Sequence, residues 1–475
     1  MKIVFYLIFM VAALLLFFYC SPSLKDEPID GELGGTPEKP EHVSPTKVPE
    51  PKEGTIYGTW VNVWVSSSET WWGEQDYHGL TTIFPDGTWK ALNWNDYKYR
   101  KIAYQKIIEA GIDFIVTDNT NYTTAQTDKI VSDFTEDSNI DLKFCVALGD
   151  AQLQSTNVMD KWLPNITKHS HYLKINEKPV IVCYVSKNVW DNNYNNDVAV
   201  SKYKDYYKVW ASGENTAPNK WGWQVEPEDG LVDSDFAAFP TPSVKQQPTT
   251  GERSWWSKSI AMLDYTFWQT RIFAPQYVIA SSYDDCSERN GWLPLKTGAA
   301  REDSNNYTPA STVQMFDPWT GKIADPYVFY NRMKSWVKGE ELYHIDGGIL
   351  SDGIYRIKNK SGVYIQADSD YMKSNMVYGQ STSKTYDKFV IYHLGEDKYR
   401  IVNVYTGMPL RIRDGKILTD VWISSKEGEF TLVKDDENTE WEFEPIGTFH
   451  KDECKFKCQI SMLNGMMTLT NFDKM

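Results

Sequence analysis

The spacing of apolar and polar residues divides the chain into four regions. An apolar run occupies residues 3–19, and a polar segment follows it up to residue 53. From residue 54 to about residue 350, short apolar runs alternate with longer stretches whose apolar residues recur at helical spacing, and these patterns predict strands and helices in turn. The predicted strands are 56–65, 113–117, 142–148, 179–185, 220–224 and 276–282. The predicted helices are 97–110, 124–134, 159–171 and 201–211.

This alternation predicts an α/β fold for residues 54–350. Continuous apolar strands separated by helices are typical of a parallel sheet that is covered on both faces. The length of the region suits a TIM-type (β/α)8 barrel, and an open doubly wound sheet is the alternative. No glycine-rich phosphate fingerprint follows the first predicted strand, which counts against a nucleotide site.

The N-terminus reads as an export signal. Lys2 precedes the apolar run, which ends at Cys20, and a basic start before an apolar core is typical of secretory signals. The pattern resembles a bacterial lipoprotein signal, in which the cysteine carries the lipid. We therefore expect a signal peptide at 1–20, lipidation at Cys20 and a location at the bacterial cell surface or outer membrane. Tyr19 stands where such signals have a small residue, so an uncleaved transmembrane anchor is the alternative. The Pro- and Glu-rich segment 21–53 predicts a disordered tether.

The composition of the chain limits the classes of partner that we expect. Aromatic residues make up 14% of the chain, with 19 Trp and 29 Tyr, and such rings either fill a core or stack on sugars. The net charge of −15 argues against nucleic acid as a partner. The six cysteines include no CxxC pair and no disulfide-dense pattern, although Cys454 and Cys458 could pair across a turn. No HExxH, GxSxG or P-loop motif is present, so we expect neither a metal nor a cofactor.

Candidate site residues lie where the predicted strands end, because function in such barrels sits at the carboxyl ends of the strands. The last predicted strand, 276–282, runs into a segment that carries Asp284, Asp285 and Glu288. Glycoside hydrolysis needs two carboxyl groups, and a solvated acidic loop is the alternative explanation of the cluster. The residues expected to line a sugar site are Asn62, Trp64, Asp118, Asn119, Tyr184, Trp223, Gln224, Tyr283 and Trp292.

Three segments of this region resemble landmarks of glycoside hydrolase families 71 and 99. They are SSYDDCSERNGWLPL at 281–295, YLKINEKPVIVCYV at 172–185 and GIDFIVTDN at 111–119. The resemblance implies a (β/α)8 barrel that cleaves α-linked polysaccharide, either α-glucan or α-mannan. It places Asp285 and Glu288 at the two catalytic carboxylates. Our working hypothesis makes Glu288 the general acid and Asp285 the base that activates water, and the resemblance leaves inversion or retention open. Asp284 stands where the families usually have Asn, and Cys286 stands at a usually aromatic position.

Residues 351–475 repeat a β-rich unit. IYRIKNKSGVYIQA at 354–367 and KYRIVNVYTGMPLR at 398–411 share YRI-x-N followed closely by Ser-Gly or Thr-Gly, and Tyr355 and Tyr399 lie 44 positions apart. A period of this length resembles the ricin-type β-trefoil, and a third lobe is expected near 441–443. The domain is predicted to bind carbohydrate, with a purely structural role as the alternative.

Two functional hypotheses follow. The first is an extracellular glycoside hydrolase with polysaccharide or oligosaccharide as substrate and a lipid anchor in the membrane. The second is a glycan-binding surface lipoprotein that uses the same barrel without catalysis. The carboxylates Asp285 and Glu288 are the feature that separates the two.

Overall fold

A computed structural model describes most of the chain from residue 50 onward. The described residues are 50–51, 53–64, 80–88, 90–120, 124–195, 202–211, 243–246, 255–280, 282–284, 291–294, 317–321, 325–359, 361–367, 376–379, 385–413, 416–419, 428–434, 441–450 and 456–462. All of them belong to one compact unit, Ser44–Met475. Cys20 and the rest of the predicted signal lie outside them. Within the described part of the chain, no helix is long and apolar enough to cross a membrane.

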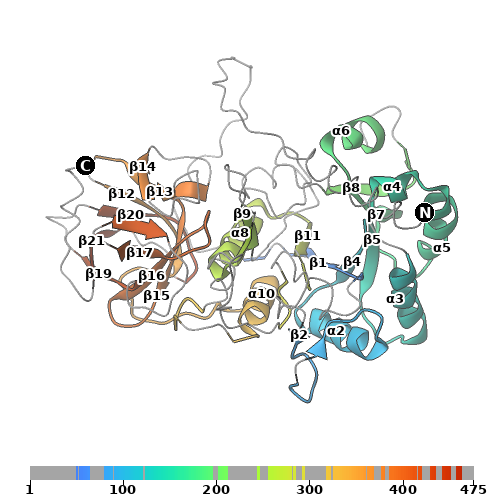
Figure 1. Ribbon diagram of the computed structural model, residues 1–475, viewed down its shortest axis with the longest axis horizontal. Coiled ribbons are helices and arrows are strands. Elements are labelled where there is room, and N and C mark those ends of the chain that lie inside the picture. Colours follow the sequence, from blue (N-terminus) through green and yellow to red (C-terminus); the bar gives the residue numbers. More distant parts are fainter. Residues whose placement is uncertain are drawn as a thin grey trace, which may run out of the picture. The chain divides into compact units, whose positions relative to one another are not determined.

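The first half of this unit is built on a mixed α/β sheet (Figure 1). The sheet has seven strands in the order β11-β1-β4-β5-β7-β6, with β8 pairing to β7. The strands are β1 (Ile56–Val61), β4 (Phe114–Asn119), β5 (Lys143–Gly149), β6 (Lys174–Ile175), β7 (Lys178–Tyr184), β8 (Tyr207–Ala211) and β11 (Tyr277–Ala280). All pairings are parallel except that of the short β6 with β7. The last parallel strand, β11, thus pairs with the first, β1.

Helices cover this sheet, and their buried side chains pack against the strands to form the hydrophobic core. They are α2 (Tyr97–Glu109), α3 (Ala125–Glu136), α4 (Asp150–Gln154), η2 (Asn157–Trp162), α5 (Leu163–Ile166), α6 (Lys187–Val189) and η3 (Trp190–Tyr194). Asp96 caps α2, because its side chain accepts a hydrogen bond from the backbone N–H of Lys98. Phe134 of α3 packs edge-on against Phe144 of β5, with ring centroids 5.7 Å apart. The strands between these helices read as almost unbroken apolar runs because both of their faces are buried.

Two glycines allow the strands of this sheet to pack closely. A Cβ atom on Gly58 of β1 would come within 2.2 Å of the Phe114 ring. A Cβ atom on Gly149, at the end of β5, would lie 2.3 Å from the Thr120 carbonyl oxygen. Glycine at these positions therefore lets an aromatic ring and a neighbouring backbone come close.

Two helices, α8 (Ile260–Phe273) and α10 (Val328–Lys338), join this half to the rest of the unit. Asp264 of α8 is fully buried and accepts hydrogen bonds from Arg332 of α10 at 2.7 and 2.9 Å. It also accepts from the indole of Trp336 at 2.7 Å and from the hydroxyl of Tyr392, which belongs to the all-β region, at 3.0 Å. We call this group of residues, Asp264, Arg332, Trp336 and Tyr392, the junction.

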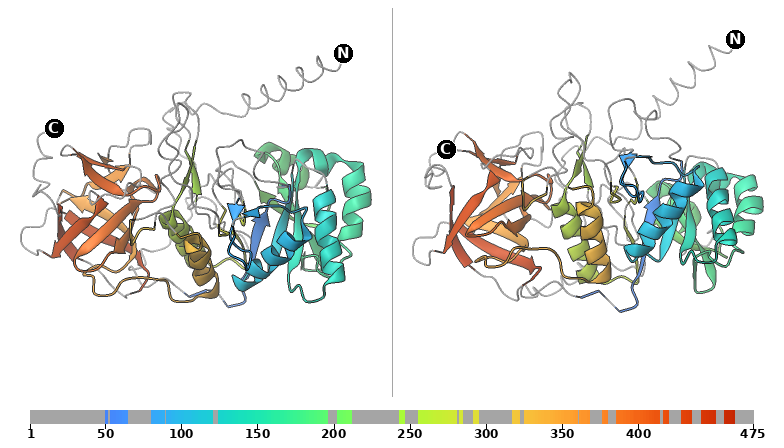
Figure 2. Two further views of the ribbon diagram at one scale, coloured as in Figure 1. Left: turned by 60° about the horizontal axis from the view of Figure 1, so that its bottom comes forward. Right: turned by 90° about the horizontal axis from the view of Figure 1, so that it is seen from below.

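The second half is an all-β sheet (Figure 2). Its order is β14-β13-β12-β15-β16-β19-β21-β20, and β20 also pairs with β12. The strands are β12 (Gly353–Asn359), β13 (Tyr364–Ala367), β14 (Met376–Gly379), β15 (Phe389–His393), β16 (Lys398–Asn403), β19 (Phe430–Lys434), β20 (Trp441–Thr448) and β21 (Phe456–Met462). The 3-10 helix η4 (Thr385–Asp387) precedes β15.

Separate two-stranded hairpins complete the described elements. They are β2 (Leu80–Thr81) with β3 (Lys90–Ala91), β9 (Ser243–Gln246) with β10 (Trp255–Lys258), and β17 (Leu410–Arg413) with β18 (Lys416–Thr419).

The repeated sequence of the second half forms two similar turns. Asn359 ends β12, and its side-chain oxygen accepts from the backbone N–H groups of residues 361 and 363 at 3.0 Å. Asn403 ends β16, and its side-chain oxygen accepts from the backbone N–H of Thr406 at 3.0 Å. A glycine with positive φ follows each, Gly362 at 76° and Gly407 at 67°. The shared YRI-x-N pattern therefore encodes a strand and the asparagine-held turn that ends it. The trefoil itself stays a prediction.

One predicted element is wrong. Residues 201–211 were expected to be helical, but Tyr207–Ala211 form β8, which pairs with β7 in parallel from Val180↔Tyr207 to Tyr184↔Ala211. The sequence YKVWA is rich in β-branched and aromatic residues, and the neighbouring strand edge decides its conformation. The strand expected at 220–224 lies outside the described residues. A mixed α/β sheet is present, and closure of that sheet into a barrel stays a prediction.

Candidate functional site

The carboxyl ends of the parallel strands place several predicted site residues on one edge of the sheet. The register aligns Val61 of β1 with Thr117 of β4, so Asn62 and Asp118 follow at the same edge. Asn119 aligns with Leu148, and Gly149 aligns with Tyr184, which brings the ends of β5 and β7 to this edge as well. We call it the carboxyl edge. In parallel α/β folds this is the edge where ligands bind.

Asp284 is a carboxylate held inside the carboxyl edge. It is fully buried, and its Oδ1 accepts from the backbone N–H of Asn62 at 2.9 Å. Its Oδ2 accepts from the indole N–H of Trp94, which is also fully buried. Both donors are neutral N–H groups, so each needs an acceptor oxygen. An asparagine in the same orientation would set its amide N–H group against one of these two donors.

The segment around Asp284 is fixed to the one that follows the acidic loop. The backbone N–H of Trp292 donates to the carbonyl of Ser282 at 3.1 Å, and that of Leu293 donates to the carbonyl of Tyr283 at 3.0 Å. The Trp292 indole donates to the Thr59 hydroxyl of β1 at 3.0 Å. Residues 282–284 and 291–294 therefore lie together against the end of β1. Asp285 and Glu288, between them in the chain, lie outside the described residues.

Asp118 holds a tryptophan at the same edge. Its Oδ2 accepts from the indole N–H of Trp64 at 3.0 Å, and its Oδ1 accepts from the backbone N–H and hydroxyl of Thr120 at 3.0 and 2.7 Å. Burial raises the pKa of Asp118, while the hydrogen bonds from Thr120, Trp64 and Trp60 oppose that rise. The carboxylate is 7% exposed, and Trp64 is half-buried. The pair therefore sets an aromatic ring at the carboxyl edge.

Asn62 and Asn119 are buried at the carboxyl edge and form hydrogen bonds inside the protein. Asn62 is 2% exposed; its side-chain oxygen accepts from the Trp60 indole at 3.2 Å, and its amide donates to the Ser282 hydroxyl at 3.3 Å. Asn119 is fully buried, and its side-chain oxygen accepts from the Thr127 hydroxyl at 2.9 Å. Both residues support the edge, and neither offers a ligand an exposed surface.

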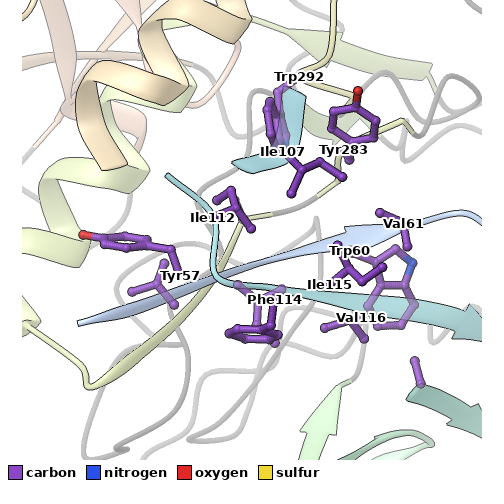
Figure 3. Packing of buried hydrophobic residues seen from close by; sticks show 14 of the residues in the cluster. Tyr57, Trp60, Val61, Ile107, Ile112, Phe114, Ile115, Val116, Tyr283 and Trp292 are labelled. Carbon is purple, nitrogen blue, oxygen red and sulfur yellow. The ribbon is translucent and has the colours of Figure 1, made fainter. Parts of the chain in front are cut away.

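Tyr283 and Trp292 lie in the hydrophobic core (Figure 3). Both are fully buried, and their rings meet edge to face with centroids 5.0 Å apart. Burial raises the pKa of the Tyr283 hydroxyl well above its ordinary value. The structure thus gives these two rings a packing role, in place of the expected sugar contact. Tyr184, by contrast, is half-buried at the end of β7. Trp223 and Gln224 lie outside the described residues.

Sequence reasoning missed Asp150, which begins α4 directly after the end of β5. Its Oδ2 accepts from the Gln154 amide at 2.7 Å, whereas its Oδ1 is buried without a hydrogen-bond partner. The side-chain oxygen of Gln152 is also buried without a hydrogen-bond partner. The available signal was a carboxylate that follows the apolar run 142–148 after a single glycine.

A separate cavity of about 560 Å³ lies away from the carboxyl edge. Arg271, Trp336, His344 and His450 are among its lining residues. Arg271 donates to the hydroxyl of Tyr57, near the amino end of β1, at 2.7 Å, so the cavity belongs to the opposite edge of the sheet. That edge usually serves stability, and we therefore keep the candidate site at the carboxyl edge. Within the described residues, no cluster of His, Cys, Asp or Glu could hold a metal ion.

No family model matches the chain, and no curated protein matches it. Among solved structures, the chain is similar to a family 99 glycoside hydrolase, an endo-α-mannosidase from Bacteroides thetaiotaomicron. The TM-score is 0.40 at 10% identity, covering 60% of this chain and 96% of that one. The same enzyme in complex with bis-tris propane gives a TM-score of 0.38 at 9% identity over the same shares. A designed 3-fold symmetric protein gives a TM-score of 0.18 at 12% identity, covering 22% of this chain and 89% of that one.

Proposed function

We propose that this protein is a glycoside hydrolase of the bacterial cell surface that acts on an α-linked polysaccharide, α-glucan or α-mannan, at the carboxyl edge. The observation that carries the proposal is the anchoring of Asp284 to the end of β1 through the backbone N–H of Asn62, at 2.9 Å. Asp285 follows directly in the chain. This anchoring supports the expectation that the acidic loop leaves the sheet beside Trp64 and Asp118.

The proposed reaction uses the two carboxyl groups of that loop. Glu288, as the acid, protonates the oxygen of the leaving sugar while the glycosidic bond breaks. Asp285, as the base, takes a proton from the water that bonds to the anomeric carbon. This assignment describes an inverting enzyme, which needs its carboxyl groups about 6.5–9.5 Å apart to admit the water. A retaining reaction is the alternative within the same proposal.

Trp64 and Tyr184 are the proposed sugar contacts among the described residues. Both are half-buried aromatic side chains at the carboxyl ends of parallel strands. An aromatic face stacks on the apolar face of a pyranose. The indole N–H and the phenol O–H can still form hydrogen bonds when water is excluded. Asp118 fixes the Trp64 ring through the hydrogen bond to its indole N–H, so its proposed role is to orient that ring.

The remaining parts of the proposal concern location and accessory binding. A lipid on Cys20 would hold the protein at the membrane, and the segment 21–53 would act as the tether. The all-β region would bind glycan and keep the enzyme on its polymer. The repeated YRI-x-N units support this last role because a repeated fold displays similar loops more than once.

The test is hydrolysis of a panel of α-glucans and α-mannans by the full chain, followed as release of reducing sugar. Asp285→Asn and Glu288→Gln should each lower the rate by about 10²- to 10⁴-fold, the usual contribution of a general acid or base. Glu136→Gln, an exposed acid at the end of α3, is the matched control and should leave the rate unchanged. Hydrolysis that survives both loop substitutions would contradict the assignment. Binding without hydrolysis by the parent would favour the non-catalytic glycan-binding protein.

A further inference from the structure

His393, the last residue of β15, is a buried histidine whose ring joins two separate backbone segments. It is 2% exposed. Its Nδ1 lies 2.7 Å from the carbonyl oxygen of Ile345, and its Nε2 lies 2.5 Å from the carbonyl oxygen of Glu396. Ile345 belongs to the connector 339–352 between α10 and β12, and Glu396 belongs to the turn between β15 and β16. The imidazole thus bridges the connector and the turn.

The chemistry of the two partners fixes the protonation of the ring. A backbone carbonyl oxygen can only accept a hydrogen bond, so each ring nitrogen must donate one. A neutral imidazole has one N–H and one lone pair, and that lone pair would face a carbonyl oxygen at hydrogen-bond distance. Only the imidazolium form, with a proton on both nitrogens, satisfies the two contacts of His393 together.

We propose that His393 carries both ring protons in the folded protein and acts as a pH-sensitive latch between the connector and the all-β region. Loss of one proton breaks one of the two carbonyl contacts and sets two lone pairs against each other. The connector is then held to the all-β region from one side only. This device is independent of the proposed glycosidase activity.

Two other elements place charged groups near the backbone of His393. From the connector, Asp352 accepts a hydrogen bond from the backbone N–H of His393 at 2.7 Å, and it is 2% exposed. From the helices, Arg332 is engaged by Asp264 in a paired contact, so the charge of that guanidinium is balanced.

Three other titratable side chains lie near the latch. Two of them pair with charged side chains, and the third is a tyrosine. Glu396 is exposed and its carboxylate is bonded to Lys398 of β16. His344 of the connector is held by the exposed Asp346, with Nε2 and Oδ1 3.1 Å apart. Tyr399 of β16 places its ring centroid 5.0 Å from that of His393, and its hydroxyl accepts from the backbone N–H of Leu350 at 3.0 Å. None of them supplies the ring of His393 with an acceptor other than the two carbonyl oxygens.

The sign of the pH effect follows from the proton count. The form of the ring that makes both carbonyl contacts carries one proton more than the form that makes a single contact. The stability that the latch contributes is therefore complete at mildly acidic pH and is lost as pH rises. Hydrogen exchange of the connector should accelerate over the same range.

The direct test is nitrogen NMR of the full chain labelled in its seven histidines. At neutral pH one buried ring should show two protonated nitrogens, and that signal should vanish in His393→Gln. His171 is the matched control, since its ring contacts a single carbonyl oxygen, that of Leu142 at 2.8 Å, and His171→Gln should leave the signal in place. A neutral tautomer at His393 would overturn the proposal.

A second measurement needs no variant and covers the case in which His393→Gln fails to fold. Hydrogen–deuterium exchange of the peptide 343–348 in the parent should speed up several-fold more between about pH 6 and about pH 8 than the intrinsic exchange rate does. The peptide 142–148, which contains strand β5, serves as the internal reference. Equal acceleration in both peptides would contradict a latch at the connector.

Discussion

The carboxyl edge and the junction each contain a fully buried carboxylate, and the two carboxylates accept hydrogen bonds from different kinds of donor. At the junction, Asp264 faces the guanidinium of Arg332 in a paired contact at 2.7 and 2.9 Å. At the carboxyl edge, Asp284 faces the backbone N–H of Asn62 and the indole N–H of Trp94. The guanidinium of Arg332 gives Asp264 a full opposite charge, whereas these two donors to Asp284 are neutral dipoles.

This difference separates architecture from a candidate site. A balanced pair holds helices and sheet together and leaves no net charge to act on a ligand. The carboxyl groups at the carboxyl edge accept hydrogen bonds from N–H and O–H dipoles, and burial raises the pKa of Asp118. Perturbed carboxyl groups at a strand-end edge are typical of functional sites, although structural networks perturb them too.

The largest effect is expected at the junction. Arg332→Met removes the cation and leaves Asp264 buried without its partner, so the free energy of unfolding should fall by about 3–5 kcal/mol. Urea denaturation of the full chain measures it. Lys90→Met, which breaks the solvent-exposed pair with Asp86 at 2.6 Å, is the matched control and should cause no measurable change. A small loss for Arg332→Met would erase the contrast between the two regions.

The next effect concerns Asp352, beside the junction. Burial raises the pKa of Asp352 to about 6, from an ordinary value of 3.8, and the hydrogen bond from the His393 backbone opposes the rise. The folded state therefore keeps a proton that the unfolded chain loses, and stability falls as pH rises from about 4 to about 6. The parent should lose about 2–3 kcal/mol more than Asp352→Asn across this range. Parallel pH profiles of the two proteins would show that Asp352 titrates normally.

Asp284→Asn should have a smaller effect at the carboxyl edge. The substituted amide sets an N–H group against one of two N–H donors, and an unsatisfied buried donor costs about 1–3 kcal/mol. We expect the free energy of unfolding to fall by about 2 kcal/mol, measured in urea. Asp86→Asn is the control because Asp86 is exposed in the hairpin of β2 and β3. An unchanged stability would mean that Asp284 accepts only one hydrogen bond.

The smallest effect is expected for Trp64→Phe. The change keeps an aromatic ring and removes the N–H that Asp118 accepts, so stability should fall by about 1 kcal/mol or less. Because that hydrogen bond lowers the pKa of Asp118, its removal should raise the pKa further. Carbon NMR of the carboxyl group checks the pKa. A fall would show that Trp64 does not stabilise the charged form.

The sequence predicted the parallel strands because their apolar runs are local signals. The runs at 113–117 and 142–148 match β4 and β5 within a few residues, and a site at the ends of β1 and β4 followed from them. The YRI-x-N repeat likewise predicted a β-rich unit twice, and the structure shows in each unit a strand that ends in a turn held by Asn359 or Asn403.

What the sequence could not predict depends on contacts across the fold. Residues 207–211 read as part of a helix, yet pairing with β7 makes them a strand. Tyr283 and Trp292 read as rings flanking a loop, but they pack on each other inside the core. The pairing of Asp264 with Arg332, 68 positions apart, leaves no local signal at all. Long-range packing decided each of these cases.

Mapping where a glycan binds tests the account most directly. Hydrogen–deuterium exchange of the full chain is compared with and without oligosaccharides derived from α-mannan and α-glucan. The account predicts slower exchange in peptides that contain residues 60–64, 118–120 and 282–294, at the carboxyl edge. Protection confined instead to residues 335–346 and 449–450, which line the cavity at the opposite edge, would contradict a sugar site at the carboxyl ends of the strands.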